Sequence, residues 1–486
     1  MVLGRILEPR DFGLVGMVMA VIGILNLLND FGLSTATVQR TKVTDEQLST
    51  LFWVNILVGA ILSLLAFLIA PIISNFYHEP RLFAVTSVLA AGFLFNAAGV
   101  QHGAILQRQM RFTVSAVIEI ISLAISVAVG IGMAVRGYGY WALVGMTISA
   151  PCVSTACVWR AAGWIPGRPR RGIGIRSMLR FGGTVTLNGL IVYLAYNLEK
   201  VLLGRYWGAE SVGIYGRAYQ LINIPTANLN SAAGGVAFAA LSRLRDEPER
   251  FRNYFLKGYS LILALTLPLT IVCSLFADDL ILVLLGPKWR GAVEPFRLLT
   301  PTILIFALIN PLGWLLFSVG LVGRSLKVAL VLAPLVITGY VIGLPYGPNG
   351  VAFAYSAVMT LWAVPHIAWC VHDTVVSFRD VMSALSRPLV AGLAAAAPAF
   401  ALQFFYGHFS SSLVRLLLGG GLFLGLYLLI LLGVMGQKTL YLEILRGFTS
   451  RSSMGGASGA AASNIVGVVV EPLKTAYATT LPKLAP

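Results

Sequence analysis

The feature that most constrains this chain is a series of thirteen continuous apolar runs, each about 20 residues long. They cover residues 12–33, 50–73, 82–105, 114–135, 139–160, 181–203, 213–238, 255–276, 295–320, 325–345, 349–371, 388–406 and 413–435. A helix needs about 20 apolar residues to cross a bilayer. Because the runs are continuous rather than alternating, they exclude a β-barrel and predict an all-α, polytopic membrane protein with about 13 transmembrane helices.

The composition agrees with a multi-pass membrane protein. The 486 residues are 57% hydrophobic and only 11% charged, whereas about a quarter of the residues in soluble proteins are charged. The net charge of +16 raises the possibility of nucleic-acid binding, but the arginines lie in short loops between apolar runs, where they set membrane topology. The four cysteines lie inside apolar runs and the five histidines are scattered. We therefore expect no enzyme, no metal site, no cofactor and no nucleic-acid partner.

An internal repeat predicts that the chain contains two copies of one membrane unit. Residues 3–30 align with residues 203–230 without a gap, so that Leu3-Gly4-Arg5 falls on Leu203-Gly204-Arg205 and Gly13 falls on Gly213. Such repeats are common in secondary transporters. The second copy is preceded by an apolar run at 181–202, whereas two residues precede the first. We therefore expect two six-helix lobes, of which the first lacks its first transmembrane helix in this chain.

The loops suggest boundaries for these lobes and an orientation in the membrane. We expect an N-terminal lobe with five transmembrane helices (1–160), a basic cytoplasmic linker (161–180) and a C-terminal lobe with six (181–371). Two additional transmembrane helices (388–435) and a partly disordered cytoplasmic tail (436–486) follow. Most lysines and arginines lie in one set of alternate loops, and the positive-inside rule places that set in the cytoplasm.

The run at 213–238 is the most polar of the thirteen and supplies the main site candidates. Arg217, Gln220, Asn223 and Asn230 recur at helical spacing, which predicts a polar stripe that faces a cavity and binds substrate. The alternative is that these groups only form hydrogen bonds with neighbouring helices. Asp30 is the repeat equivalent of Asn230 and is a further candidate, with an interfacial position at its helix end as the alternative.

Charged groups at membrane depth supply the remaining candidates, because such groups are rare there and are commonly functional. Lys200 and Arg217 could attract a diphosphate or an acidic sugar, and Glu199 could tune them; anchoring at the interface is the alternative. Glu119 and Glu199 are candidates for ion coupling, and a snorkelling or hydrogen-bonded carboxylate is the alternative for Glu119. Asn188 and Asn310 are weaker polar candidates.

Several short segments resemble one known family. They are Arg10-Asp11-Phe12-Gly13-Leu14-Val15 with Asp30-Phe31-Gly32-Leu33, the stretch from Asn197 to Arg205, Leu241-Ser242-Arg243-Leu244, Leu285-Gly286-Pro287-Lys288-Trp289, and the stretch from Tyr346 to Ala352. Together they resemble the polysaccharide transporter family, in particular Wzx-type exporters of colanic acid and exopolysaccharides, within the superfamily of multidrug exporters and lipid II flippases.

The resemblance implies a flippase that moves a polyprenyl-diphosphate-linked oligosaccharide across the bacterial inner membrane by alternating access. Its partners would be that glycan, the lipid bilayer and polysaccharide polymerase and export machinery, and the product would be exopolysaccharide or lipopolysaccharide. A multidrug or small-cation antiporter of the same superfamily is an alternative, as is a membrane O-antigen polymerase or ligase. An ion gradient, the membrane potential and substrate supply all stay open as energy sources.

Overall fold

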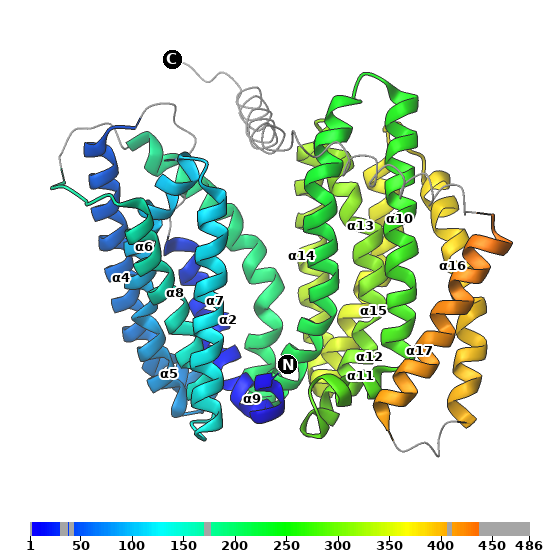
Figure 1. Ribbon diagram of the computed structural model, residues 1–486, viewed down its shortest axis with the longest axis horizontal. Coiled ribbons are helices and arrows are strands. Elements are labelled where there is room, and N and C mark those ends of the chain that lie inside the picture. The colour runs from blue at the N-terminus through cyan, green and yellow to red at the C-terminus, as the bar shows by residue number, and fades with distance from the viewer. Residues whose placement is uncertain (1, 30–36, 38–42, 170–175, 406–410, 437–486) are drawn as a thin grey trace. The chain divides into compact units, whose positions relative to one another are not determined.

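The computed structural model describes residues 2–29, 37, 43–169, 176–405 and 411–436, and every regular element among them is a helix (Figure 1). Close contacts divide the chain into unit 1, Met1–Gly216, and unit 2, Arg217–Pro486. This contact boundary lies after the predicted linker at 161–180, so the first part of the next helix belongs to unit 1. The lobe boundaries given above stay a prediction.

Unit 1 is built from eight elements in the part of the chain that the structure describes. They are α1 (Val2–Ile6), α2 (Pro9–Asn29), α4 (Asp45–Tyr77), α5 (Arg81–Ala90), α6 (Gly92–Arg108), α7 (Phe112–Val135), α8 (Trp141–Ala162) and the first part of α9 (Arg176–Arg243). A capping box begins α4, in which the Gln47 amide donates to Thr44 Oγ1 over 3.3 Å and the Thr44 amide donates to Gln47 Oε1 over 3.2 Å. This reciprocal pair satisfies backbone donors that a helix start leaves open.

Unit 2 begins within α9 and ends with a pair of helices. Its further elements are α10 (Pro248–Leu275), α11 (Ala277–Leu284), η1 (Pro287–Ala292), α12 (Val293–Leu299), α13 (Pro301–Ser318), α14 (Val322–Gly343), η2 (Leu344–Tyr346), α15 (Gly347–Val371), α16 (Phe378–Phe405), α17 (Ser412–Leu428) and the π-helical η4 (Leu429–Val434). Within this unit α10 lies between α13 and α16, and α15 contacts α12, α13 and α14.

In the part of the chain that the structure describes, each of the thirteen apolar runs lies mainly on helix. Ten described segments are long and apolar enough to cross a membrane. One of them, Gly323–Val371, contains two of the predicted runs, and α9 contains two more. The prediction of an all-α, polytopic membrane protein is therefore confirmed.

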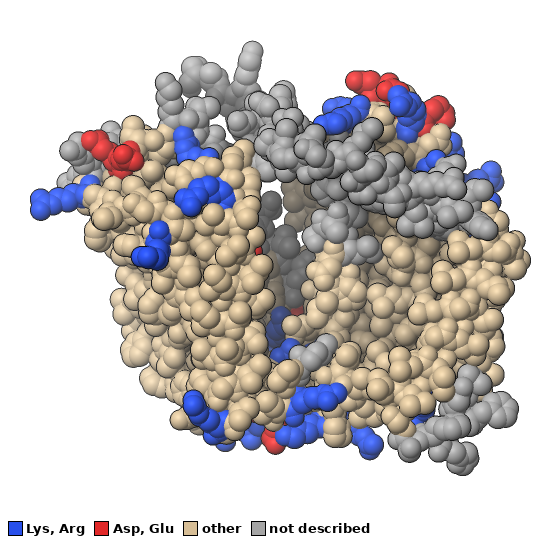
Figure 2. All heavy atoms as spheres, in the orientation of Figure 1, with Lys and Arg blue, Asp and Glu red and all other residues tan. Residues whose placement is uncertain are grey.

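The helices present apolar side chains outward, as a membrane requires. On α4, five residues at helical spacing are between 55% and 64% exposed: Leu57, Ile61, Leu64, Leu68 and Ile72. The opposite face of the same helix is buried and includes Gly59, Leu62, Ala66, Ala70 and Ile73. On the face of each unit shown in Figure 2, most Lys and Arg side chains lie toward the two helix ends, with a largely uncharged wall between. Lipid contact explains this wall, because in water such a surface would be an aggregation site.

The internal repeat is visible as a shared break in the helices. In the first copy α1 ends at Ile6 and α2 begins at Pro9. In the second copy the long helix α9 is interrupted at Gly208, which has φ 78° and ψ −178°. In the gap-free alignment Gly208 falls on Glu8, between α1 and α2. The two copies therefore bend at the same place, and glycine allows the positive φ in the second.

The same repeat forms a reciprocal crossing inside unit 1. A Cβ built on Gly13 would lie 1.6 Å from the carbonyl oxygen of Ala209, and one built on Gly213 would lie 1.9 Å from that of Pro9. Residues 9 and 13 are the repeat equivalents of 209 and 213, so each copy presents the same glycine to the same carbonyl of the other. This is the two-fold pattern of an isologous contact, and we call it the glycine crossing. It requires glycine because the two backbones approach too closely for any side chain.

The first residues of the predicted linker are fixed to unit 1. Gly167 donates its amide to Ser49 Oγ over 2.9 Å, and its carbonyl accepts from Trp53 Nε1 at 2.9 Å. His102 Nε2 lies 3.2 Å from the Trp164 carbonyl oxygen, and its ring stacks on Trp159 with the centroids 4.3 Å apart. The chain that leaves α8 therefore remains attached to its own unit as far as Gly167.

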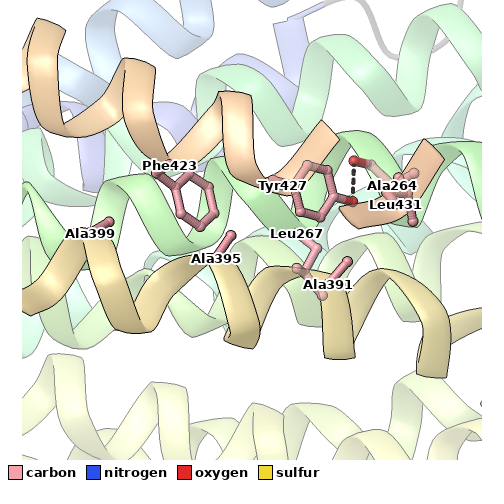
Figure 3. Close-up of a cluster of buried hydrophobic side chains, with 8 residues drawn as sticks. All are labelled: Ala264, Leu267, Ala391, Ala395, Ala399, Phe423, Tyr427 and Leu431. Atoms are coloured by element: carbon pink, nitrogen blue, oxygen red, sulfur yellow. Dashed lines mark hydrogen bonds between the residues drawn. The ribbon is translucent and has the colours of Figure 1, made fainter. Parts of the chain in front are cut away.

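The last two helices, α16 and α17, pack on α10 within unit 2. Ala391, Ala395 and Ala399 lie four residues apart on α16 and are fully buried, so the backbones approach closely (Figure 3). The Tyr427 hydroxyl of α17 donates to the Ala264 carbonyl of α10 over 2.9 Å. These contacts give the C-terminal helix pair an interface with α10 that is made of small residues and one buried hydrogen bond.

Two ion pairs hold the C-terminal helix pair at its ends. Arg252 of α10 donates through Nε to Asp380 Oδ2 over 2.9 Å, and through Nη2 to Oδ1 over 2.5 Å, at the start of α16. Arg415 near the start of α17 donates through Nη2 and Nε to Asp279 Oδ1 of α11, over 2.6 and 3.0 Å. Asp279 is only 8% exposed, so its charge depends on this partner.

Candidate functional site

The predicted polar stripe lies on the second part of α9 and begins where unit 2 begins. Arg217 is half-buried and donates through Nη1 to Gln220 Oε1. Gln220 and Asn223 are exposed. Asn223 also accepts through its backbone carbonyl from Thr226 Oγ1, at 2.9 Å. The structure thus brings Arg217 and Gln220 together as a hydrogen-bonded pair of a guanidinium group and an amide.

Asn230 is placed differently from the rest of the stripe. At about 100° per residue, Asn230 lies about 140° around the helix from Arg217 but only about 20° from Asn223. Asn230 lines a pocket inside unit 2, whereas Gln220 and Asn223 are exposed. Asn223 and Asn230 therefore share a helix face and differ because they lie about two turns apart along it.

We call this cavity the unit 2 pocket. It is a small, partly open space of about 20 Å³ between α9, α10 and α13, and it is lined by Thr226, Asn230, Ile262, Thr266, Ile303, Phe306, Ala307, Asn310, Pro311 and Trp314. No charged side chain is among them. The Asn230 Oδ1 atom is buried and has no hydrogen-bond partner among the described residues. A buried amide oxygen without a partner loses a substantial part of its hydration energy, so this atom is poised to accept a hydrogen bond.

Lys200 and Glu199 lie on the first part of α9, in unit 1. Lys200 Nζ donates to Asn197 Oδ1 over 2.7 Å, and Asn197 Nδ2 donates to the Tyr193 carbonyl over 3.1 Å. The Tyr193 hydroxyl in turn donates to the Met19 carbonyl of α2 over 3.1 Å. Glu199 is 1% exposed, and its Oε2 has no hydrogen-bond partner among the described residues. A buried carboxylate of this kind is costly as an anion in a membrane.

The remaining candidates are placed as follows. Asp30 lies outside the described residues. Glu119 is described and is exposed on α7. Of the two weaker candidates, Asn310 lines the unit 2 pocket together with Asn230, and the side chain of Asn188 is outside what the structure describes. No residue in the described ranges belongs to a group of His, Cys, Asp and Glu that could hold a metal ion.

Sequence reasoning missed a second pocket, in unit 1. This unit 1 pocket is a partly open space of about 60 Å³ between α2, α5, α6 and α8, and it is lined by Met19, Ile22, Asn26, Leu89, Gly92, Phe93, Asn96, Thr147, Ile148 and Pro151. The signal that could have revealed it is a second piece of the repeat, since Leu94-Phe95-Asn96-Ala97-Ala98-Gly99 resembles Leu308-Ile309-Asn310-Pro311-Leu312-Gly313. This match identifies Asn96 and Asn310 as a pair.

The candidate residues offer two kinds of chemistry. Arg217 of unit 2 and Lys200 of unit 1 are cationic and can each attract an anion, and each is oriented by an amide oxygen. The pocket of each unit offers uncharged amides and hydroxyls surrounded by apolar walls.

Comparison with known proteins identifies the family. The model of a family described as polysaccharide biosynthesis protein matches residues 2–294, which is more than half of the chain. The chain belongs to this polysaccharide biosynthesis protein family. Its match with the lipopolysaccharide biosynthesis protein WzxC of Escherichia coli K12 is 27% identical over 348 residues, or 70% of each chain. The resemblance inferred from short motifs is confirmed.

Two further relatives agree with this membership. TuaB, a teichuronic acid biosynthesis protein of Bacillus subtilis, is 30% identical over 297 residues; the match covers 60% of this chain and 61% of TuaB. ExoT, a succinoglycan biosynthesis transport protein of Rhizobium meliloti, is 22% identical over 465 residues, which is 95% of this chain and 93% of ExoT. The similarity to ExoT extends beyond residue 294 into most of unit 2.

Solved structures show the fold of this family member. The lipid II flippase MurJ, in an inward closed conformation, superimposes with a TM-score of 0.70 at 13% identity and covers 88% of this chain and 94% of its own. A multidrug resistance transporter of the MATE family, inward-facing, gives a TM-score of 0.60 at 16% identity over 79% of this chain. At such identities the likeness concerns the fold alone, which is all-helical in the part of the chain that the structure describes.

Proposed function

We propose that this chain is a flippase that moves a polyprenyl-diphosphate-linked oligosaccharide across the bacterial inner membrane by alternating access. The family membership carries this proposal, because WzxC, TuaB and ExoT are all named for polysaccharide biosynthesis. The fold shared with the lipid II flippase MurJ supports it, since lipid II is itself a lipid-linked glycan. The product is exopolysaccharide or lipopolysaccharide.

The cargo determines what the chain has to supply. A diphosphate cannot cross hydrocarbon alone, and a cationic group compensates its charge best. Arg217 has this role in the proposal, with Gln220 Oε1 orienting its guanidinium. Lys200 has the same role on the first part of α9, where Asn197 orients the ammonium group. Gln220 and Asn223 are exposed and can contact the polar part of the cargo.

Glu199 is the better placed of the two ion-coupling candidates. It is almost completely buried, whereas Glu119 is exposed. A buried carboxyl group favours its protonated form unless a cation lies close. We propose that Glu199 takes up and releases a proton as the carrier changes conformation, which would couple transport to a proton gradient.

The alternatives account for less of what is observed. An antiporter of cationic drugs would prefer an acidic stripe, whereas the stripe on α9 carries Arg217 and no carboxylate from 217 to 243. A polymerase or ligase would need a large extracytoplasmic segment for its chemistry. The segment 277–294 instead forms the short helices α11 and η1, and Trp289 is fully buried there. Polysaccharide polymerase and export machinery are the partners that would receive the cargo.

The test is to reconstitute the full chain in liposomes that contain an undecaprenyl-diphosphate-linked oligosaccharide and to measure how fast the glycan becomes accessible to an added glycosidase. We expect Arg217→Ala to slow transfer about tenfold, because a hydrogen bond to a charged group contributes about 1.5–3 kcal/mol. Arg136→Ala, which removes an exposed arginine beyond the end of α7, is the matched control. No transfer by the unmodified chain would contradict the proposal, and equal rates for the two variants would remove Arg217 from the site.

A further inference from the structure

Pro311 interrupts the backbone hydrogen bonds of α13 beside the unit 2 pocket. Proline lies inside this helix and has no N–H group, so residue 311 cannot donate the α-helical hydrogen bond to the carbonyl of Ala307. Ala307 is buried, and both residues line the pocket. Inside a membrane, a carbonyl that loses its helical donor is satisfied by a neighbouring side chain or by ordered water. The pocket therefore lies where α13 has a hydrogen bond to replace.

A second acceptor faces the same space from α9. Asn230 lines the pocket, and its Oδ1 atom is buried and has no hydrogen-bond partner among the described residues. A buried acceptor without a partner is unfavourable, and proteins commonly satisfy such atoms with ordered water. Two different helices thus each bring an oxygen that needs a donor to one small cavity.

The other polar groups of the lining define what a ligand has to offer. Thr266 Oγ1 donates to the Ile262 carbonyl over 2.8 Å. Thr226 Oγ1 donates to the Asn223 carbonyl over 2.9 Å. Both hydroxyl hydrogens are therefore in use, while the hydroxyl oxygens keep lone pairs that accept. Asn310 adds an amide whose Nδ2 group donates, so the ligand has to donate and to accept.

Size and charge both select water. The volume of about 20 Å³ exceeds the roughly 10–15 Å³ that one water molecule needs, and it excludes any larger ligand. The lining contains no charged side chain, so an ion bound here would have no counter-charge at membrane depth. A cation cannot accept a hydrogen bond and an anion cannot donate one, whereas a buried water does both and forms about three.

We propose that the unit 2 pocket binds one ordered water molecule, which donates to Asn230 Oδ1 and to the Ala307 carbonyl and accepts from the Asn310 amide. The water joins the second part of α9 to the proline break of α13. It explains why a polar side chain at position 230 lies against this cavity, two turns from the exposed Asn223. The site does not depend on the flippase function proposed above.

The water can be observed directly in the unmodified protein. A cryo-electron microscopy map of the full chain in lipid nanodiscs, at a resolution that shows ordered water, should contain one peak within hydrogen-bond distance of Asn230 Oδ1 and the Ala307 carbonyl oxygen. The peak should be the same in sodium chloride and in choline chloride. A map that shows ordered water elsewhere in unit 2 but no peak here would overturn the proposal, as would a peak that requires sodium.

A pair of substitutions tests what the water does. Asn230→Leu removes one of its partners and should shorten the half-life of the folded chain, heated in detergent, by up to about tenfold, which corresponds to one or two hydrogen bonds. Pro311→Ala returns an N–H donor to the Ala307 carbonyl. In that background the water has less to satisfy, so Asn230→Leu should shorten the half-life by no more than about threefold.

A second proline provides the matched control. Pro334 lies inside α14 and does not line the unit 2 pocket. In the Pro334→Ala background, Asn230→Leu should therefore shorten the half-life by the same factor as in the unmodified chain. Equal factors in all three backgrounds would overturn the proposed link between the water and the proline break. An Asn230→Leu chain that is as stable as the unmodified one would overturn the water site itself, because removing an amide that binds nothing relieves a cost instead of adding one.

Discussion

The glycine crossing gives the sharpest test of the repeat. In Gly13→Ala the new Cβ would lie 1.6 Å from the Ala209 carbonyl oxygen, and in Gly213→Ala it would lie 1.9 Å from that of Pro9. Ordinary contact begins at 3.4 Å, so α2 and α9 would have to separate by roughly 1.5–1.8 Å. Neither clash can be relieved by a rotamer change, because both partners are backbone atoms.

The expected cost is that of overpacking a core, about 1–3 kcal/mol for each variant. We therefore expect each to lower the midpoint of thermal unfolding by about 1–3 °C, because the unfolding entropy of a chain this long is large. The measurement is the fraction of monodisperse protein after heating in detergent, followed by size-exclusion chromatography. Gly216→Ala is the matched control on the same helix, since a Cβ there meets nothing within 4 Å. That variant should be as stable as the unmodified chain or more stable, because alanine favours a helix by up to about 1 kcal/mol over glycine.

The double variant tests whether the two contacts form one crossing. Once Gly13→Ala has separated the helices, the additional methyl group of Gly213→Ala has space. The double variant should therefore lose less stability than the sum of the losses of the two single variants. Two outcomes would refute the reasoning. One is that Gly13→Ala is no less stable than Gly216→Ala, and the other is that the two changes are fully additive.

Two further predictions concern charged groups. Glu199→Gln should make transfer of the glycan in liposomes independent of an imposed pH gradient. Glu210→Gln changes an exposed residue of the same helix and, as the control, should keep the pH dependence of the unmodified chain. A pH dependence that persists in Glu199→Gln would exclude Glu199 as the proton carrier. Arg415→Ala should destabilise the protein by about 2–3 kcal/mol, somewhat below the cost of breaking a fully buried pair, because Arg415 is 31% exposed on its side chain. Asp279→Asn combined with Arg415→Gln should recover most of that loss in the same thermal assay, and a double variant as unstable as Arg415→Ala would show that an unpaired charge is not the cause.

Much of the fold could be predicted from the sequence because the hydrocarbon core of the bilayer restricts the backbone to few structures. Apolar runs of about 20 residues have few alternatives to helix in lipid, and the exposed stripe from Leu57 to Ile72 shows the lipid-facing side that results. The repeat also predicted that Gly13 and Gly213 are equivalent. It could not predict that each would contact the other's copy, because an alignment relates positions within two units and contains no information on where two helices cross.

The candidate site was only partly accessible to sequence reasoning. Arg217 and Gln220 were expected together and do form a hydrogen bond. Asn230 was expected beside them but lines the unit 2 pocket. It lies about two turns beyond Asn223 on the same helix face, and the sequence does not show which neighbouring helices pack at that level. Trp314 lines the same pocket, and the sequence did not predict this, because an aromatic residue in an apolar run is ordinary.

The paired attachment of α16 and α17 has a practical consequence for the study of transport. Arg252–Asp380 joins one end of the C-terminal helix pair to α10, Asp279–Arg415 joins the other end to α11, and Tyr427 fixes the middle. Because α16 and α17 are attached to α10 and α11 at three levels, we expect them to move together with those helices. A fluorophore at Leu417, which is 65% exposed on α17, would therefore report displacement of the whole of unit 2 from a position remote from the cargo, and its distance to a second label on α10 should stay constant throughout a transport cycle.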